Sequence, residues 1–139
     1  MLAFILSVIL SLEADFVQTK TLSMMNEPQV SVGHMSYRSP DYLRWSYTSP
    51  QTLTWEIDGE RSNVNPQVQR LLRMIMGSIA NEQEDQRAQK ESKKLFQSVT
   101  VTMDEKTHVA QRVEMIEKNG DKPVIEFNHV VVKELIRNS

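Results

Sequence analysis

The chain has 139 residues, with 16 basic and 18 acidic side chains and a formal net charge of -2. This length suits a single domain with one core, and the even mixture of charges leaves no basic stripe for a nucleic acid backbone. Because cysteine is absent, disulfides, thiolate nucleophiles and sulfur-dependent zinc sites are excluded. We therefore expect one domain over residues 1–139 that does not bind nucleic acid.

The first twelve residues are apolar except for two serines. This run is too short to span a bilayer, and it lacks the lysine or arginine with which a signal peptide begins. Two interpretations remain open: the tail of an export signal, or a helix that is buried on nearly all sides. We favour the buried helix.

Two strand-like stretches follow, at residues 15–25 and 29–38, separated by a turn. In the second stretch the side chains alternate between two faces, and Gly33, Met35 and Tyr37 share one of them. This alternation predicts a strand with one face turned toward a core.

Residues 39–59 contain both tryptophans of the chain and two of its three tyrosines. Pro40 and Pro50 interrupt the pattern and predict a corner before each of two further strands. One face of these two strands is apolar and consists of Leu43, Trp45, Tyr47, Leu53, Trp55 and Ile57. An apolar row on one side only is typical of an antiparallel sheet with one face in water.

Residues 66–80 have helical periodicity. Asn65 is a suitable N-cap, and Pro66 suits the first turn. The apolar positions of this helix are Val68, Leu71, Leu72, Ile75, Met76 and Ile79. The following residues, 81–94, are mostly charged or amide side chains, so we expect them to face solvent as an exposed helix or a connector.

Strand patterns return at residues 96–103, 109–117 and 124–132. Asn119-Gly120 predicts a hairpin between the last two, because both residues tolerate positive φ. The predicted fold is mainly β: a curved antiparallel sheet with an N-terminal helix and one central helix.

No set of residues for catalysis is recognisable. The three histidines, His34, His108 and His129, are far apart in sequence and lack metal-ligand spacing. The chain has no Gly-rich phosphate loop and no G-x-S-x-G motif. We therefore expect no catalytic residue, no metal site and no cofactor.

Apolar side chains are the unusual feature of this sequence. Eight methionines accompany the aromatic side chains, and methionine is frequent at permissive binding surfaces. These residues could simply form the core. A single helix of about 22 Å, however, would cap a curved sheet without filling it, which predicts an interior that accepts hydrocarbon.

Three motifs carry a family resemblance: F-x-Q-x-K at 16–20, P-x-x-L-R-W-x-Y-x-x-P at 40–50 and E-K-N-G-D at 117–121. In this combination the chain resembles the LolA-type periplasmic carriers of outer-membrane lipoproteins, especially their Bacteroidetes-like members. The similarity extends over most of the chain.

The resemblance implies an unclosed antiparallel β-barrel with an N-terminal helix, and with the helix at 66–80 as part of a lid. It also implies a periplasmic chaperone that shields lipoprotein acyl chains between the inner-membrane ABC exporter and an outer-membrane acceptor. The signal peptide would be absent from this sequence or only partly represented in it. We expect a monomer.

On this basis we predict a lipid-binding surface on the apolar faces of the strands and the helix. It comprises Met35, Tyr37, Leu43, Trp45, Tyr47, Leu53, Trp55, Ile57, Leu71, Leu72, Ile75, Met76 and Ile79. The family's lid latch is an arginine directly before the proline, but Ser39 holds that place here. Arg38 and Arg44 are therefore our candidate latch residues.

The chain is also short at two places where the family usually has further strands, after Gly59 and around residues 81–94, so that either the sheet is reduced or strands are missing from this sequence. Two rival functions stay open. One is a structural or interaction domain with a solid core that has lost transport; the other is an enzyme, which would need carboxylates or a histidine inside the cavity.

Overall fold

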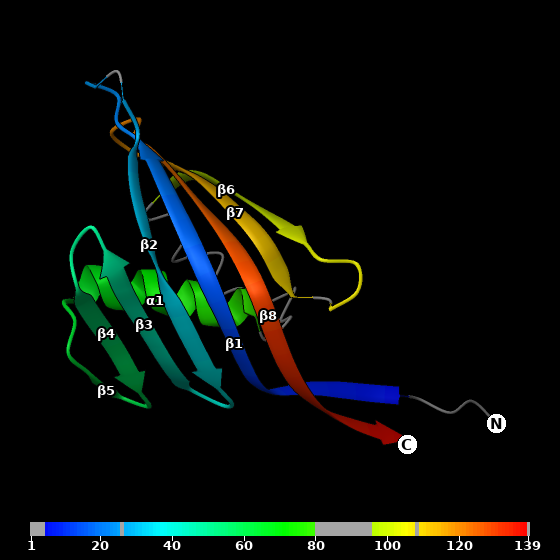
Figure 1. Cartoon of the computed structure of the whole chain (residues 1–139). Coiled ribbons are helices and arrows are strands. Elements are labelled where there is room, and N and C mark those ends of the chain that lie inside the picture. The colour runs from blue at the N-terminus through cyan, green and yellow to red at the C-terminus, as the bar shows by residue number, and fades with distance from the viewer. Residues whose placement is uncertain (1–4, 26, 80–95, 108, 139) are drawn as a thin grey trace.

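The described part of the chain forms one antiparallel sheet with a single helix, α1 (Pro66–Ile79), across one face (Figure 1). The computed structural model describes residues 5–25, 27–79, 96–107 and 109–138. The eight strands are β1 (Ile5–Thr21), β2 (Gln29–Arg38), β3 (Tyr42–Ser49), β4 (Leu53–Asp58), β5 (Arg61–Ser62), β6 (Phe96–Met103), β7 (Ala110–Glu117) and β8 (Lys122–Asn138).

The strand order is β5-β4-β3-β2-β1-β8-β7-β6, and each neighbouring pair is antiparallel. The two edge strands, β5 and β6, do not pair in the described structure, so the sheet is unclosed. This confirms the predicted unclosed antiparallel fold. We call the face that packs against α1 the inner face and the opposite one the outer face.

The predicted N-terminal helix is wrong. Residues 5–21 form the long central strand β1, whose beginning pairs with the end of β8 from Ile5 opposite Asn138 to Ile9 opposite Glu134. The β-branched residues of this run suit a strand. A short apolar run fits helix and strand equally well, and here pairing with the far end of the chain decides for the strand.

The predicted alternation in β2 and β3 is confirmed. Met35, Tyr37, Leu43 and Trp45 are buried on the inner face. Gly33 has to be glycine for packing reasons, because a Cβ there would lie 2.0 Å from a backbone oxygen of β3 and within 3 Å of the Phe16 ring. The inner face is therefore closely packed along the middle of the sheet.

Helix α1 begins as predicted. The Asn65 side chain accepts a hydrogen bond of 2.9 Å from the backbone N–H of Val68, which is N-cap geometry. Leu72 and Ile75 are buried against the sheet, and the Arg73 guanidinium donates to the Gly59 carbonyl at 2.9 Å. The described residues include no helix with the length and apolar character needed to cross a membrane.

The last three strands form two hairpins, close to the predicted ranges. Asp104 closes the first turn by accepting from the backbone N–H groups of Lys106 and Thr107, and Gly120 adopts φ 94° in the second. Strand β8 is longer than predicted because it pairs with the whole of β1. The segment predicted to be solvent-facing, 81–94, lies outside the described residues.

Candidate binding cavity under the helix

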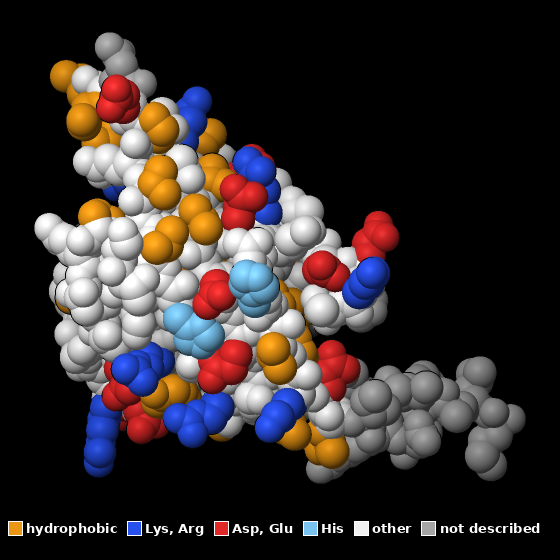
Figure 2. Space-filling model, viewed as in Figure 1, with side chains coloured by type: hydrophobic (Ala, Val, Ile, Leu, Met, Phe, Trp, Pro, Cys, Tyr) orange, Lys and Arg blue, Asp and Glu red, His pale blue; other side chains and the backbone are white. Residues whose placement is uncertain are grey.

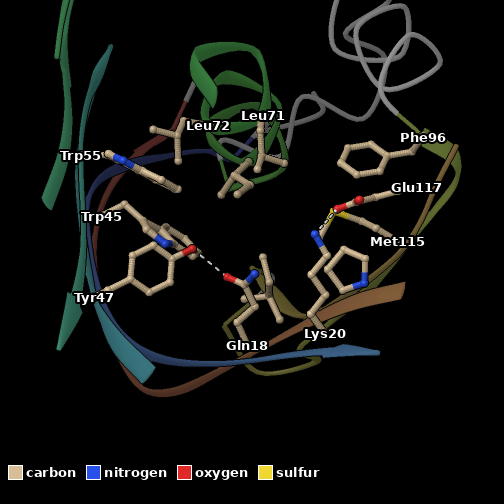
Figure 3. Close-up of a pocket in the computed structure, with 13 residues that line it drawn as sticks. Gln18, Lys20, Trp45, Tyr47, Trp55, Leu71, Leu72, Phe96, Met115 and Glu117 are labelled. Carbon is tan, nitrogen blue, oxygen red and sulfur yellow. Dashed lines mark hydrogen bonds and ion pairs between the residues drawn. The ribbon is translucent and has the colours of Figure 1, made fainter. Parts of the chain in front are cut away.

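A cavity of about 190 Å³ lies between the inner face and α1 (Figure 3). We call it the inner cavity. Its lining is mostly apolar and comes from α1 and from strands of both halves of the sheet. The lining residues are Gln18, Lys20, Trp45, Tyr47, Trp55, Leu71, Leu72, Ile75, Phe96, Met115, Glu117, Pro123 and Ile125.

Stacked aromatic rings form the wall of the inner cavity on the β3 and β4 side. The Phe16 ring stacks on Trp45 with centroids 4.1 Å apart, and Tyr47 meets Phe16 and Trp55 edge-on at 5.4 and 5.3 Å. Such contacts hold each ring in a defined orientation. The rings brace one another and leave the space under α1 unfilled.

Several of the predicted lipid-binding residues do line the inner cavity: Trp45, Tyr47, Trp55, Leu71, Leu72 and Ile75. A second group is buried in the core away from the cavity: Met35, Tyr37, Leu43, Ile57 and Met76. Ile79 is the last residue of α1, and its side chain is outside the described part. Sharing the inner face is thus necessary but not sufficient for lining the cavity.

A second, more open hollow of about 530 Å³ lies beside the β3–β4 turn. We call it the outer groove. The predicted residue Leu53 lines it, and it shares Tyr47 and Trp55 with the inner cavity. Those two rings therefore contribute to the walls of both hollows.

The sequence-based prediction missed the polar residues of the inner cavity. Gln18 and Lys20 extend the alternation of Phe16 along β1, so parity within the F-x-Q-x-K motif was a signal for both. Glu117 reaches the same space from β7. Its place depends on how β6 to β8 pack against β1, for which the sequence carries no local signal.

The polar atoms of the inner cavity form two groups (Figure 3). In the first, the Tyr47 hydroxyl donates to the Gln18 side-chain oxygen at 2.8 Å. The indole N–H of Trp45 has no hydrogen-bond partner among the described residues, although this side chain is only 1% exposed. In the second, the Lys20 ammonium lies 3.1 Å from Glu117 and 3.9 Å from Asp121.

Burial raises the pKa of the Tyr47 hydroxyl, and the indole N–H of Trp45, which is near this hydroxyl but makes no hydrogen bond of normal geometry, lowers it by less. Tyr47 is therefore a neutral hydroxyl at physiological pH. The backbone N–H of Ser23, which donates to Asp121 at 3.0 Å, lowers the pKa of that carboxyl group. Asp121 is thus an anion beside Lys20.

The candidate latch residues, Arg38 and Arg44, have exposed side chains. The Arg38 guanidinium lies 4.4 Å above the ring centre of Tyr42, a cation–π contact, and the Tyr42 hydroxyl donates to Glu56. One contact between α1 and the edge of the sheet is the hydrogen bond from Arg73 to the Gly59 carbonyl. The roles of Arg38 and Arg44 as a latch stay predictions.

A cluster of histidines and carboxylates lies on the outer face (Figure 2). His34 bonds Asp15 at 3.0 Å and Glu13 at 2.9 Å, and His129 bonds Asp15 at 2.9 Å. The hydrogen bonds to Asp15 and, to a smaller extent, to Glu13 raise the pKa of His34. The described residues contain no group of three or more side chains arranged to hold a metal ion. The cluster is separated from the inner cavity by the sheet.

Comparison with known proteins assigns a family to about half of the chain. The family model described as outer membrane lipoprotein carrier protein LolA matches residues 7–75. This span runs from β1 into α1 and contains most of the aromatic wall together with residues 66–75 of the helix that covers it. No curated protein matches the chain.

Proposed function

Because this chain belongs to the LolA family, we propose that it carries lipoproteins through the periplasm by holding their acyl chains in the inner cavity. The family supports a lipoprotein carrier role in general, is periplasmic, and binds its cargo without transforming it. We propose an inner-membrane ABC exporter as the donor and an outer-membrane acceptor as the destination.

The observation that supports this function most is the unfilled inner cavity. A domain with a purely structural role would be expected to pack this space with side chains, since interiors are close-packed. Here aromatic rings and leucines surround about 190 Å³ instead. An apolar cavity of this kind suits hydrocarbon better than a polar ligand.

The size of the cavity predicts weak, exchangeable binding. If one methylene needs about the volume of a water molecule, ~30 Å³, a cavity of 190 Å³ holds about six of them. At ~0.8 kcal/mol per methylene, their transfer contributes about 5 kcal/mol, from which the entropy cost of association is subtracted. Weak binding allows release to an acceptor.

A whole acyl chain needs more space than this. Typical ligand sites measure at least ~300 Å³, so we propose that α1 moves outward during loading. The bond between Arg73 and the Gly59 carbonyl would break in that motion. The outer groove, which adjoins the inner cavity at Tyr47 and Trp55, would take the part of the chain that the cavity cannot hold.

Titration with a fluorescent acyl probe tests this function. Leu72→Glu places a charge under α1, and Trp55→Asp places one in the aromatic wall. Both should abolish probe binding, whereas Glu114→Gln, on the outer face of β7, should not change it. Wild-type affinity in both cavity variants, with folding verified by circular dichroism, would contradict the cavity assignment.

A further inference from the structure

Simple storage of hydrocarbon does not explain the polar groups of the inner cavity. Lys20 and Glu117 line it as an ion pair, with Asp121 beside them, and their side chains are 29%, 27% and 13% exposed. Keeping charges partly out of water is costly unless they are well paired. The placement of Lys20 and Glu117 at the wall of a mostly apolar space calls for a role in choosing the ligand.

This ionic group carries an excess of negative charge. One ammonium group faces two carboxylates, and hydrogen bonds lower the pKa of Asp121 so that it stays ionised. The net charge of the group at neutral pH is therefore -1. A ligand that brings a further negative charge to this place is repelled.

Hydrogen-bond donors are available on the same wall. Gln18 lies between Tyr47 and the Lys20–Glu117 pair (Figure 3), and its side-chain amide carries two N–H donors. The buried indole N–H of Trp45 is without a partner among the described residues. A buried donor left unpaired costs free energy, and a ligand oxygen that accepts from it removes this cost.

We propose that the inner cavity selects uncharged acyl esters over free fatty acid anions. An ester carbonyl oxygen accepts from Gln18, Trp45 or Lys20 and adds no charge. A carboxylate accepts equally well but meets the net negative charge of the Lys20, Glu117 and Asp121 group. This inference rests on the proposed function, and it restricts the cargo to acyl chains that are esterified.

The test compares two ligands with the same twelve-carbon chain. Each ligand is titrated, below its own critical micelle concentration, into the full chain loaded with the uncharged dye N-phenyl-1-naphthylamine at pH 8, and displacement of the dye is measured. One ligand is 1-monododecanoylglycerol, a neutral ester, and the other is sodium dodecanoate. We expect the ester to bind about tenfold more tightly, the scale set by one like charge at close range in a partly solvated site.

Glu117→Gln is the decisive variant, because it brings the net charge of the group from -1 to 0. It should tighten dodecanoate binding about tenfold, and the preference for the ester over dodecanoate should fall by about the same factor. Glu114→Gln is the matched control: it lies on the same strand, pairs with Arg112 at 2.8 Å and is exposed on the outer face. This control should keep the wild-type preference.

Lys20→Met provides a second measurement. It leaves two carboxylates without their cation, so dodecanoate binding should weaken further while the dye still binds.

The outcomes separate the two proposals. If the dye and both ligands bind but Glu117→Gln and Glu114→Gln show equal preferences, the selection mechanism is overturned and the carrier function stands. If neither ligand displaces the dye from the wild-type protein, both proposals fail.

Discussion

Filling the inner cavity should weaken acyl binding without harming the fold. Leu71 lies on α1, is partly buried and lines the cavity, so the indole of Leu71→Trp would project into the unfilled space. If it takes half of the 190 Å³, about three methylenes of the ligand lose their place. At ~0.8 kcal/mol each, this is about 2.4 kcal/mol, or roughly 50-fold in affinity.

The assay is displacement of N-phenyl-1-naphthylamine by 1-monododecanoylglycerol, with urea unfolding in parallel. The stability should change by less than about 1 kcal/mol, because the new ring enters a void and does not overpack the core. Leu10→Trp, on an exposed part of β1 away from both hollows, is the matched control and should bind normally. Equal affinity of Leu71→Trp and the wild type would refute the cavity as the binding site.

Three further predictions concern stability. Gly33→Ala should destabilise the fold by ~3 kcal/mol or more, measured by urea unfolding, because its Cβ would lie 2.0 Å from the Ser46 carbonyl oxygen. Asn65→Ala should lower the free energy of unfolding by about 1 kcal/mol in the same assay, because α1 loses its N-cap. Asn65→Asp should keep most of the stabilisation that the cap provides. His34→Gln should lower stability more at pH 5.5 than at pH 8.5, because the hydrogen bond to Asp15 raises the pKa of His34.

The sign of the His34 effect follows from proton linkage. The pKa of His34 in the folded state lies above the unfolded value of 6.5, so the folded protein holds the proton more tightly. The contribution of His34 to the free energy of unfolding is therefore full below about pH 6.5 and is lost as the pH rises through the folded-state pKa. The pKa of Asp15 is lowered in the folded state. The contribution of Asp15 to the free energy of unfolding is therefore present above its unfolded-state pKa of 3.8 and is lost as the pH falls through the folded-state pKa. A pH-independent difference in stability between His34→Gln and the wild type would contradict the linkage argument. An unchanged urea-unfolding midpoint in Gly33→Ala would contradict the packing argument, and the same result in Asn65→Ala would contradict the capping argument.

Local patterns were enough to predict most of the architecture. The row Leu43, Trp45 and Tyr47 was assigned to one face of a strand because side chains alternate there, and Leu43 and Trp45 are buried on the inner face. The start of α1 followed from Asn65 and Pro66 in the same way. In both cases the physical cause lies within a few residues of the position concerned.

The errors concern interactions between distant parts of the chain. The apolar run at residues 1–12 predicts a helix because nothing local reveals that residues 5–9 pair with Glu134 to Asn138, more than 120 positions away. Lys20 and Glu117 were not recognised as a pair for the same reason: they meet only when β1 and β7 bend around one space. Apolar parity likewise could not separate Leu71, which lines the cavity, from Met76 in the core.

The location of the acyl chain is the central claim, and the two tryptophans report on it directly. Trp45 and Trp55 are the only tryptophans of the chain, and both line the inner cavity. Titration with a 1-monoacylglycerol that carries bromine atoms on its acyl chain should quench their fluorescence in a saturable way, while the unbrominated ligand should not. Saturable binding of the brominated ligand with no loss of tryptophan fluorescence would place the chain elsewhere and contradict the account.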